Sequence, residues 1–334
     1  MTGKSGKYVA VLVTSVGSTT ALSVIKSLRL SSRYQFRIIG TDINKPKEIA
    51  SSYFCDQMYQ VPLYKQKDYL DRLLKICLSE KVRVLVPVLD QEVEKLAKYS
   101  SLFSRKGISV AASAYESVKI CNDKYLTYLY LKKSGIKTPP VYEIKSALEE
   151  NLQPPLFLKP RNGVSSVGCY RITSLSELTI LANKVNNPVV QKELSGEKFV
   201  IDVINDMDGR NLASVPRLEI SSKAGIGVKA RVVKDSQLSK YGAKVSEVIK
   251  IRGAANIEVF KKNNSIKLIE INPRFSAGSI LTCVAGCNMA EIVVDLNLGN
   301  RISLDRFRYR KNVFMARFWQ EIFYSGNKVI YYHD

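Results

Sequence analysis

A strand-like segment near the end of the chain carries side chains suited to binding a metal ion and a phosphate. It reads Lys267-Leu-Ile-Glu270-Ile-Asn272-Pro-Arg274-Phe275, so a carboxylate, an amide and a guanidinium occupy positions i, i+2 and i+4. Alternate residues of a β-strand share one face. Carboxylate and amide oxygens suit Mg²⁺, which also binds nucleotide phosphates, and a guanidinium can hold the anion. The alternative interpretation is a half-buried strand whose polar residues face water.

A second segment has the composition of a phosphate-binding loop. Strand-like residues 155–160 and 169–172 flank a loop that contains Gly163, Ser165, Ser166 and Gly168. Glycine and small hydroxyl residues let a backbone turn tightly, so that its N–H groups can surround phosphate oxygens. Lys159, at the end of the first strand, would add a positive charge. No Gly-Lys-Ser/Thr opens a helix here, so this is not a Walker-type loop, and an ordinary glycine hairpin is the alternative.

Together the two segments resemble the ATP-grasp superfamily, and more narrowly the carboxylate–amine ligases related to the halves of carbamoyl-phosphate synthetase large subunits. The resemblance runs from about residue 8 to about residue 320. It implies an α/β and α+β fold in which a Rossmann-like N-terminal domain precedes a two-lobed ATP-grasp module. It also implies that ATP phosphorylates a carboxylate to an acyl phosphate, which an amine then attacks to give an amide.

The resemblance assigns residues to the nucleotide. Residues 190–194 are similar to the hinge that reads the adenine edge, and residues 163–168 to the loop that covers the phosphates. The family's ribose-binding glutamate is replaced by Lys198, and the adjacent Glu197 is the candidate substitute, although on a strand it would point to the opposite face. The implied nucleotide-binding residues are Lys124, Lys159, Gly163, Ser165, Ser166, Gly168, Gln191, Lys192, Glu193, Leu194 and Glu197.

The resemblance also assigns the metal ligands and the basic residues that face phosphate. It implies two Mg²⁺ ions, with Mn²⁺ as a substitute, held by Glu258, by a bridging Glu270 and by Asn272. Arg274 matches the arginine that holds the transferred phosphoryl group. The remaining candidates for contact with the triphosphate or the acyl phosphate are Arg217, Lys229 and Arg231.

Composition argues against several other mechanisms. The only histidine, His333, is the penultimate residue, which disfavours Ser-His-Asp hydrolases, Cys-His nucleophile pairs and histidine-based zinc sites. The 6 cysteines are scattered without a CxxC motif, which predicts free thiols in a reducing compartment. No segment reads as a membrane span, and the apolar run Val9–Val13 is too short for a signal peptide. We therefore expect a cytoplasmic enzyme, and the resemblance suggests a homodimer.

Charge is the unusual feature of the composition. The chain has 51 Lys and Arg against 30 Asp and Glu, a net charge of +21. Such a field attracts anionic partners. Nucleic acid is not predicted, because the basic residues are spread out and no known nucleic-acid-binding motif is present. An anionic small-molecule acid or amine, such as a nucleotide sugar or a polysaccharide precursor, explains the charge, and a merely solvated basic surface is the alternative.

Hydrophobic patterning divides the chain into four parts. Residues 1–113 alternate short apolar strands with helices, which is typical of a parallel sheet. The small lobe with the phosphate loop then occupies residues 114–187, the large lobe with the metal strand residues 188–325, and a tail residues 326–334. Residues 115–135 are predicted to be one helical stretch.

Two features of the N-terminal part could contribute to a site. Asp90 and Glu92 follow a predicted strand and are candidates to face an amine. Gly17 and Asp42 faintly resemble a dinucleotide fingerprint, but the GxGxxG motif is missing, so NAD is not predicted.

Two other functions remain open. The first is bicarbonate activation of the carbamoyl-phosphate type, although the chain is too short for the two ATP sites of a complete synthetase. The second is a degenerate ATP-grasp fold that binds a nucleotide or an anionic polymer without turnover. Intact Glu258, Glu270 and Asn272 argue against this second function, and Lys198 favours it.

Overall fold

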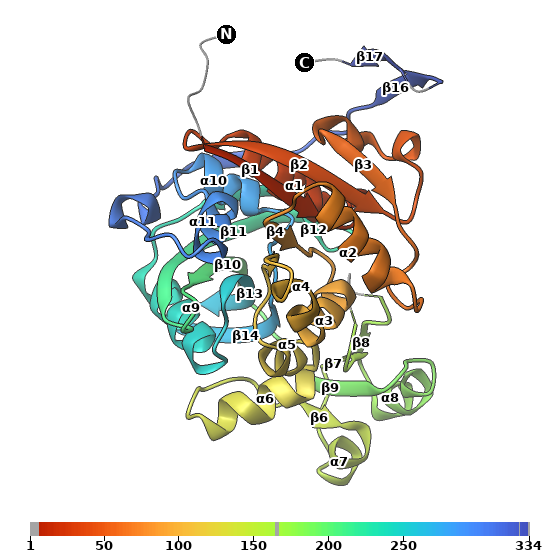
Figure 1. The fold of residues 1–334 in the computed structure, drawn as a ribbon. Coiled ribbons are helices and arrows are strands. Elements are labelled where there is room, and N and C mark those ends of the chain that lie inside the picture. Colours follow the sequence, from red (N-terminus) through yellow and green to blue (C-terminus); the bar gives the residue numbers. More distant parts are fainter. Residues whose placement is uncertain (1–6, 164–166, 327, 333–334) are drawn as a thin grey trace.

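The computed structural model describes residues 7–163, 167–326 and 328–332, and its first sheet is parallel (Figure 1). The strand order is β3-β2-β1-β4-β5. Val11 and Leu12 in the first strand are fully buried, as expected of a parallel strand covered on both faces. The elements are β1 (Lys7–Val13), α1 (Thr19–Arg29), β2 (Tyr34–Asp42), η1 (Pro46–Glu48), η2 (Ala50–Phe54), β3 (Gln57–Gln60), α2 (Tyr69–Ser79), β4 (Val84–Val86), α3 (Asp90–Lys98), α4 (Ser100–Ser104) and β5 (Ser109–Val110).

The next part of the chain forms the small lobe, at the opposite end of the molecule from the first sheet (Figure 1). Its antiparallel strands are ordered β6-β9-β7-β8. The prediction of one helix over residues 115–135 is wrong, because Asp123 has an extended backbone and its carboxylate accepts hydrogen bonds from the first N–H groups of a second helix. The elements are α5 (Tyr115–Asn122), α6 (Lys124–Lys133), β6 (Tyr142–Glu143), α7 (Ile144–Glu149), β7 (Leu156–Pro160), β8 (Tyr170–Ile172), α8 (Leu175–Ala182) and β9 (Pro188–Lys192).

The large lobe is built on an antiparallel sheet with the strand order β14-β13-β10-β11-β12-β15. The turn after its first strand is a hairpin, in which Asp206 N donates to Arg210 O and Gly209 has a φ of +88°. The elements are β10 (Glu197–Asn205), β11 (Asn211–Lys223), β12 (Ile226–Val232), α9 (Ser236–Val248), β13 (Gly253–Lys262), β14 (Ser265–Asn272), α10 (Ser279–Val284), α11 (Met289–Asn297), η3 (Leu304–Phe307) and β15 (Phe314–Ala316).

One face of the large sheet is apolar and packs on α9. Ile201 and Val203 of β10 share a buried cluster with Leu238 and Val245 of the helix. A Cβ atom on Gly242 of α9 would lie 2.7 Å from Ile201, so a glycine is required for the helix to approach the sheet this closely. Because strand side chains alternate, the neighbouring polar residues of β10 must point to the other face.

The first sheet and the large lobe share a core. Residues of β1 and α1 belong to the same buried cluster as residues of α10 and α11. A polar network crosses the same boundary, because Ser31 and Tyr34 donate hydrogen bonds to Glu291 and Asp295 of α11, and Arg306 forms ion pairs with both carboxylates. These links fix the N-terminal sheet against the lobe that carries the metal strand.

The end of the chain forms a two-stranded hairpin. Residues 328–332, in the segment predicted to be a tail, form β17 (Lys328–Tyr332), which pairs with β16 (Ile322–Ser325). All 6 cysteines are free thiols, as predicted. No helix within the described ranges is long and apolar enough to cross a membrane.

Replacing Arg306 with Met should destabilise the fold. The side chains of Glu291 and Asp295 are 7% and 1% exposed, and the substitution would leave two buried carboxylates without their cation. We expect a loss of about 3–5 kcal/mol in the free energy of unfolding, measured by urea denaturation. The control is Arg308→Met at an exposed arginine two residues away, for which we expect a change within about 0.5 kcal/mol. Equal stability of the two variants would contradict the role of the network.

Candidate active site

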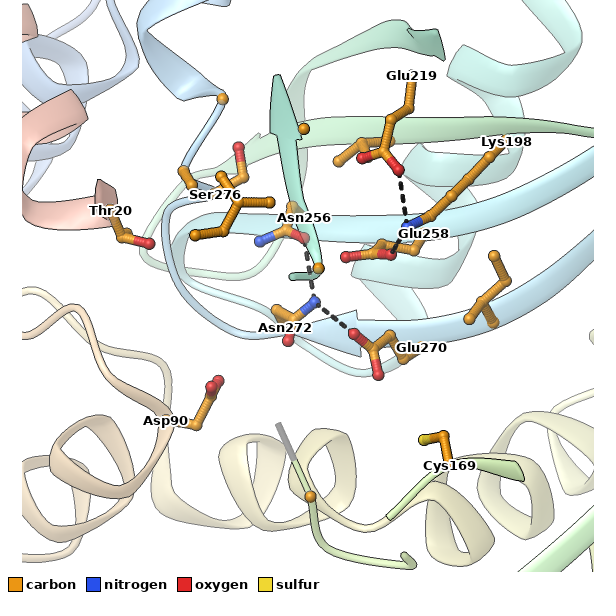
Figure 2. Close-up of a pocket in the computed structure, with 18 of the residues that line it drawn as sticks. Thr20, Asp90, Cys169, Lys198, Glu219, Asn256, Glu258, Glu270, Asn272 and Ser276 are labelled. Carbon is orange, nitrogen blue, oxygen red and sulfur yellow. Dashed lines mark hydrogen bonds and ion pairs between the residues drawn. The ribbon is translucent and has the colours of Figure 1, made fainter. Parts of the chain in front are cut away.

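A cavity of about 710 Å³ lies where the three parts of the fold meet (Figure 2). The polar face of the large sheet lines it through β10 to β14, and the small lobe lines it through β7 and β9. The N-terminal part contributes the residues that open α1 and α3. Segments that are far apart in the sequence therefore line one cavity.

The predicted metal strand is β14, which pairs with β13, and four polar side chains of these two strands lie next to one another. Asn256 lies opposite Asn272, and Glu258 opposite Glu270. The amide nitrogen of Asn272 donates to Asn256 Oδ1 at 3.1 Å and to Glu270 Oε1 at 3.4 Å. Burial and the neighbouring Glu270 carboxylate raise the pKa of Glu258 above its ordinary value. Two carboxylates that face each other in this way favour a cation between them.

The donor set fits Mg²⁺ if a nucleotide supplies further oxygens. Within the described ranges, no group of three or more His, Cys, Asp or Glu side chains is arranged to hold a metal ion by itself. Mg²⁺ is commonly bound by one or two carboxylates together with substrate phosphates and water. Glu258, Glu270 and Asn272 are therefore the residues that would hold it, and the ion would neutralise phosphate charge.

Lys198 lies inside this acidic group. Its ammonium is 2.9 Å from Glu258 Oε2 and 3.0 Å from Glu219 Oε1, as Figure 2 shows. Burial lowers its pKa, but the two carboxylates outweigh burial and raise the pKa of Lys198 above the ordinary value. The sequence indicated only that this position departs from the family pattern.

Two further lysines approach the metal strand from the small lobe. Lys124 Nζ is 3.7 Å from Glu270 Oε2 and donates to the backbone oxygen of Gly163 at 3.0 Å. Lys159 is 4% exposed, and its ammonium donates to Gln191 Oε1 at 2.8 Å. Burial, with a smaller effect from the charge of Lys124, lowers the pKa of Lys159 to about 8.

The structure brings part of the predicted nucleotide site to the cavity. Residues of this group that line it are Lys124, Lys159, Gly163, Gln191, Glu193 and Leu194. Lys192 and Glu197 are exposed and do not line the cavity, and Lys198 lines it instead of Glu197. Gly168 lies next to the lining residues Val167 and Cys169. Ser165 and Ser166 are outside the described residues.

Of the four basic residues predicted to contact phosphate, two arginines line the cavity and the other two residues do not. Arg274 forms a bidentate pair with Asp90 of α3, at 2.9 and 2.8 Å, and Arg217 binds Asp202 at 2.7 and 2.9 Å. Both arginines line the cavity. On β12, Ala230 lines the cavity, so its strand neighbours point to the other face. The structure therefore does not bring Lys229 and Arg231 to the site; Lys229 is exposed, and Arg231 stacks on Phe314.

The N-terminal part contributes differently from the prediction. Asp90 reaches the cavity, although Arg274 occupies its carboxylate. Glu92 is buried and accepts hydrogen bonds from Thr14, Ser15 and Tyr69, so it does not face an amine.

Sequence reasoning missed several cavity residues. The first turn of α1 reaches the cavity through packing of the N-terminal part on the large lobe, and Glu219 and Lys198 meet through strand pairing, so neither contact gives a local signal. Asn256 could have been found, because Asn256 and Glu258 show the same i, i+2 spacing as Glu270 and Asn272.

Two protein-family models match parts of the chain. A model described as "ATP-grasp in the biosynthetic pathway with Ter operon" matches residues 184–318. A model described as "PylC-like, N-terminal domain" matches residues 11–111. The first match covers β10 to β14 and the second covers the parallel sheet, so the two models cover most of the cavity-lining elements.

Known proteins share the fold at low sequence identity. The carbamoyl phosphate synthase large chain of Thermotoga petrophila is 24% identical over 284 residues, which are 78% of this chain and 25% of that protein. This chain thus spans about a quarter of the length of the first such relatives. Biotin carboxylase from Campylobacter jejuni superposes with a TM-score of 0.72 and 14% identity, over 90% of this chain and 73% of that one. L-amino acid ligase from Bacillus licheniformis gives 0.68 and 16%, over 91% and 78%.

Binding of a nucleotide should be coupled to protonation of Lys159. Because its pKa of about 8 lies below the ordinary 10.5, the ammonium loses its proton as pH rises through about 8. Anionic phosphates favour the charged form, so ADP affinity should fall above that pH, and binding at about pH 8.5 should take up a proton. Calorimetry in two buffers with different ionisation enthalpies measures the uptake.

Lys159→Met is the matched variant, because it removes the charge and keeps a side chain of similar length. It should bind ADP more weakly and without proton uptake at the same pH. Uptake that persists in this variant would show that another group is responsible.

Proposed function

Because the chain belongs to the ATP-grasp superfamily of ATP-dependent ligases, we propose that it joins a carboxylate to an amine. In the first step a carboxylate oxygen attacks the γ-phosphorus of ATP, which gives an acyl phosphate and ADP. In the second step the amine nitrogen attacks the acyl carbon, phosphate leaves with the bonding electrons, and the nitrogen loses a proton. The products are an amide, ADP and phosphate.

The observation that carries this proposal is a cavity rich in fixed charges and poor in nucleophiles. Glu258, Glu270 and Lys124 are arranged to bind metal and phosphate, and phosphoryl transfer depends chiefly on such positioning and charge neutralisation. Among the described lining residues there is no histidine, and the one thiol, Cys169, has its pKa raised by burial. Direct transfer between bound substrates fits this inventory better than covalent catalysis by the protein.

The two ends of the cavity suit different substrates. The hinge residues and Phe157 lie at one end, where we place the nucleotide. The first turn of α1 lies across the cavity from the small lobe, and Thr20 there is 8% exposed, with its hydroxyl directed toward Asn256 and Ser276 (Figure 2). First-turn N–H groups have no acceptor within the helix and attract anions. We place the substrate carboxylate at this end.

Several features bear on the substrate class. The net charge of +21 favours anionic substrates, and a nucleotide sugar or polysaccharide precursor is our preferred acceptor. The description of the matching family model, which refers to a biosynthetic pathway, supports a role in biosynthesis. Bicarbonate is the second candidate, favoured by the similarity to carbamoyl phosphate synthase.

ADP release tests the proposal. The chain is incubated with Mg-ATP and single carboxylates, including bicarbonate and nucleotide sugars with uronic acids, with and without pooled amines. Release that needs both a carboxylate and an amine supports a carboxylate–amine ligase, and release with bicarbonate alone supports the second candidate. Salt-sensitive binding to an anionic polymer, without ADP release and without ATP binding, would overturn the proposal.

Glu270→Ala should abolish ADP formation and preserve the fold. The substitution removes a proposed metal ligand, whereas a neighbouring apolar residue of the same strand, Ile271, stays buried in the core. We expect the rate of ADP release to fall by at least about a hundredfold, because even the outer partners of metal ligands cost ten- to a hundredfold. The melting temperature should not fall. Glu149→Ala, at an exposed glutamate of α7, is the control, and normal turnover by Glu270→Ala would rule out the metal assignment.

Thr20→Val should weaken binding of the carboxylate substrate alone. The change keeps the shape and removes a hydroxyl from the lining of the cavity. A lost hydrogen bond to a charged group predicts that the KM of the carboxylate rises about tenfold while the KM of ATP stays constant. Thr41→Val is the matched control, since the Thr41 hydroxyl is buried and does not line the cavity. An equal rise in both KM values would argue against the carboxylate end proposed here.

A further inference from the structure

We propose that Lys198 is an internal counter-cation of the metal site and limits the site to one divalent ion per chain. The inference rests on the proposed function, from which the metal ion comes. It concerns a residue that the family resemblance marks only as a departure, and it changes the expectation of two bound ions to one.

The first argument is the position of the ammonium. On β13, Lys198 pairs with Phe260, two residues from Glu258, so the two side chains share one face of the sheet. Continuing the β10–β11 register by one pair beyond Phe199 and Leu218 puts Glu219 opposite Lys198, on the same face. The ammonium of Lys198 forms ion pairs with Oε2 of Glu258 at 2.9 Å and with Oε1 of Glu219 at 3.0 Å. One oxygen of the proposed metal ligand Glu258 is therefore already bound to a cation.

The second argument is charge. The ion pairs of this cluster join three carboxylates (Glu219, Glu258 and Glu270) to the ammonium groups of Lys198 and Lys124. Lys159, whose charge also acts on Glu270, adds a further positive charge, so the cluster carries at most one negative charge in excess. One divalent ion more than cancels that excess. A second divalent ion would have to displace the ammonium from Glu258 or bind beside it against repulsion.

The third argument is that the lysine is confined. Its side chain is only 27% exposed, and those of Glu219 and Glu258 are 10% and 19% exposed. A Cβ atom on Gly227 would lie 3.2 Å from Glu219 Oε2, so the Glu219 carboxylate packs close to the β12 backbone, which limits its movement toward that strand. The pair restricts Lys198 to the carboxylate cluster, which an exposed surface ion pair would not do.

The test counts metal ions directly. Mn²⁺ is titrated into the full chain with ADP present, and free Mn²⁺ is followed by electron paramagnetic resonance. Wild type should bind one Mn²⁺ per chain. Lys198→Met should bind two, and the first should bind at least about tenfold more tightly because a repelling charge is gone. Lys198→Arg, which keeps the positive charge, should bind one Mn²⁺ per chain, as wild type does.

Two further variants separate this role from a general charge effect. Glu219→Gln leaves the ammonium with Glu258 alone, so it should weaken Mn²⁺ binding, in the opposite direction to Lys198→Met. This variant also keeps the proposal testable if Lys198→Met does not fold. Lys262→Met removes an exposed lysine from the end of β13 and should match wild type.

Two Mn²⁺ ions bound by wild type, or equal number and affinity in wild type and Lys198→Met, would overturn the inference and leave Lys198 a structural ion pair. In that case the ligase function would stand if ADP release persists. No Mn²⁺ binding by any variant would overturn the metal site itself, and with it both this inference and the proposed function.

Discussion

The alternation of side chains across the large antiparallel sheet is the constraint on which the rest of the structure depends. One face of β10 and β13 packs on α9, which requires the close approach at Gly242. The intervening residues then have to point into the cavity, whatever their charge. Glu258, Glu270 and Arg217 all lie on the cavity side of this sheet. The hydrophobic face fixes the register of the sheet, and a slip of one residue would exchange the two faces.

The charges on the polar face are largely paired before any substrate arrives. Asp90 and Asp202 each hold an arginine through two hydrogen bonds, and such pairs fix the guanidinium plane. Pre-positioned groups need little reorganisation when charge moves during phosphoryl transfer. The Asp90 pair has a second consequence, because it comes from α3 and ties the N-terminal part to the metal strand. The orientation of Arg274 therefore depends on how the two parts dock.

Local spacing predicted the strand that carries Glu270 and Asn272 and the two strands around the phosphate loop, because each depends on residues close together in sequence. The placement of Lys124 beside Glu270 came from the family resemblance instead, since the two residues are far apart in the chain. Prediction from local spacing failed where it needed to know which face of a strand a side chain occupies. Lys229 and Arg231 were placed at the phosphates, yet the alternation set by Ala230 directs them away. Irregular pairing between Glu219 and Ser222 breaks simple alternation along β11. The partners of Lys198 lie on two other strands, so no pattern within β10 could reveal them.

The contrast between exterior and cavity has a consequence for the form of nucleotide that binds. A chain with a net charge of +21 attracts polyanions in general, whereas the ion pairs around Glu258 leave an excess carboxylate at the point where phosphates must pass. Free ATP would bring its own negative charge against that carboxylate. A nucleotide already bound to a divalent ion offers the cation that the carboxylates lack and less charge to repel. On the proposed function, the acidic pair would therefore favour the metal-bound nucleotide, and Lys198 would keep the excess charge small enough for a single ion to cancel.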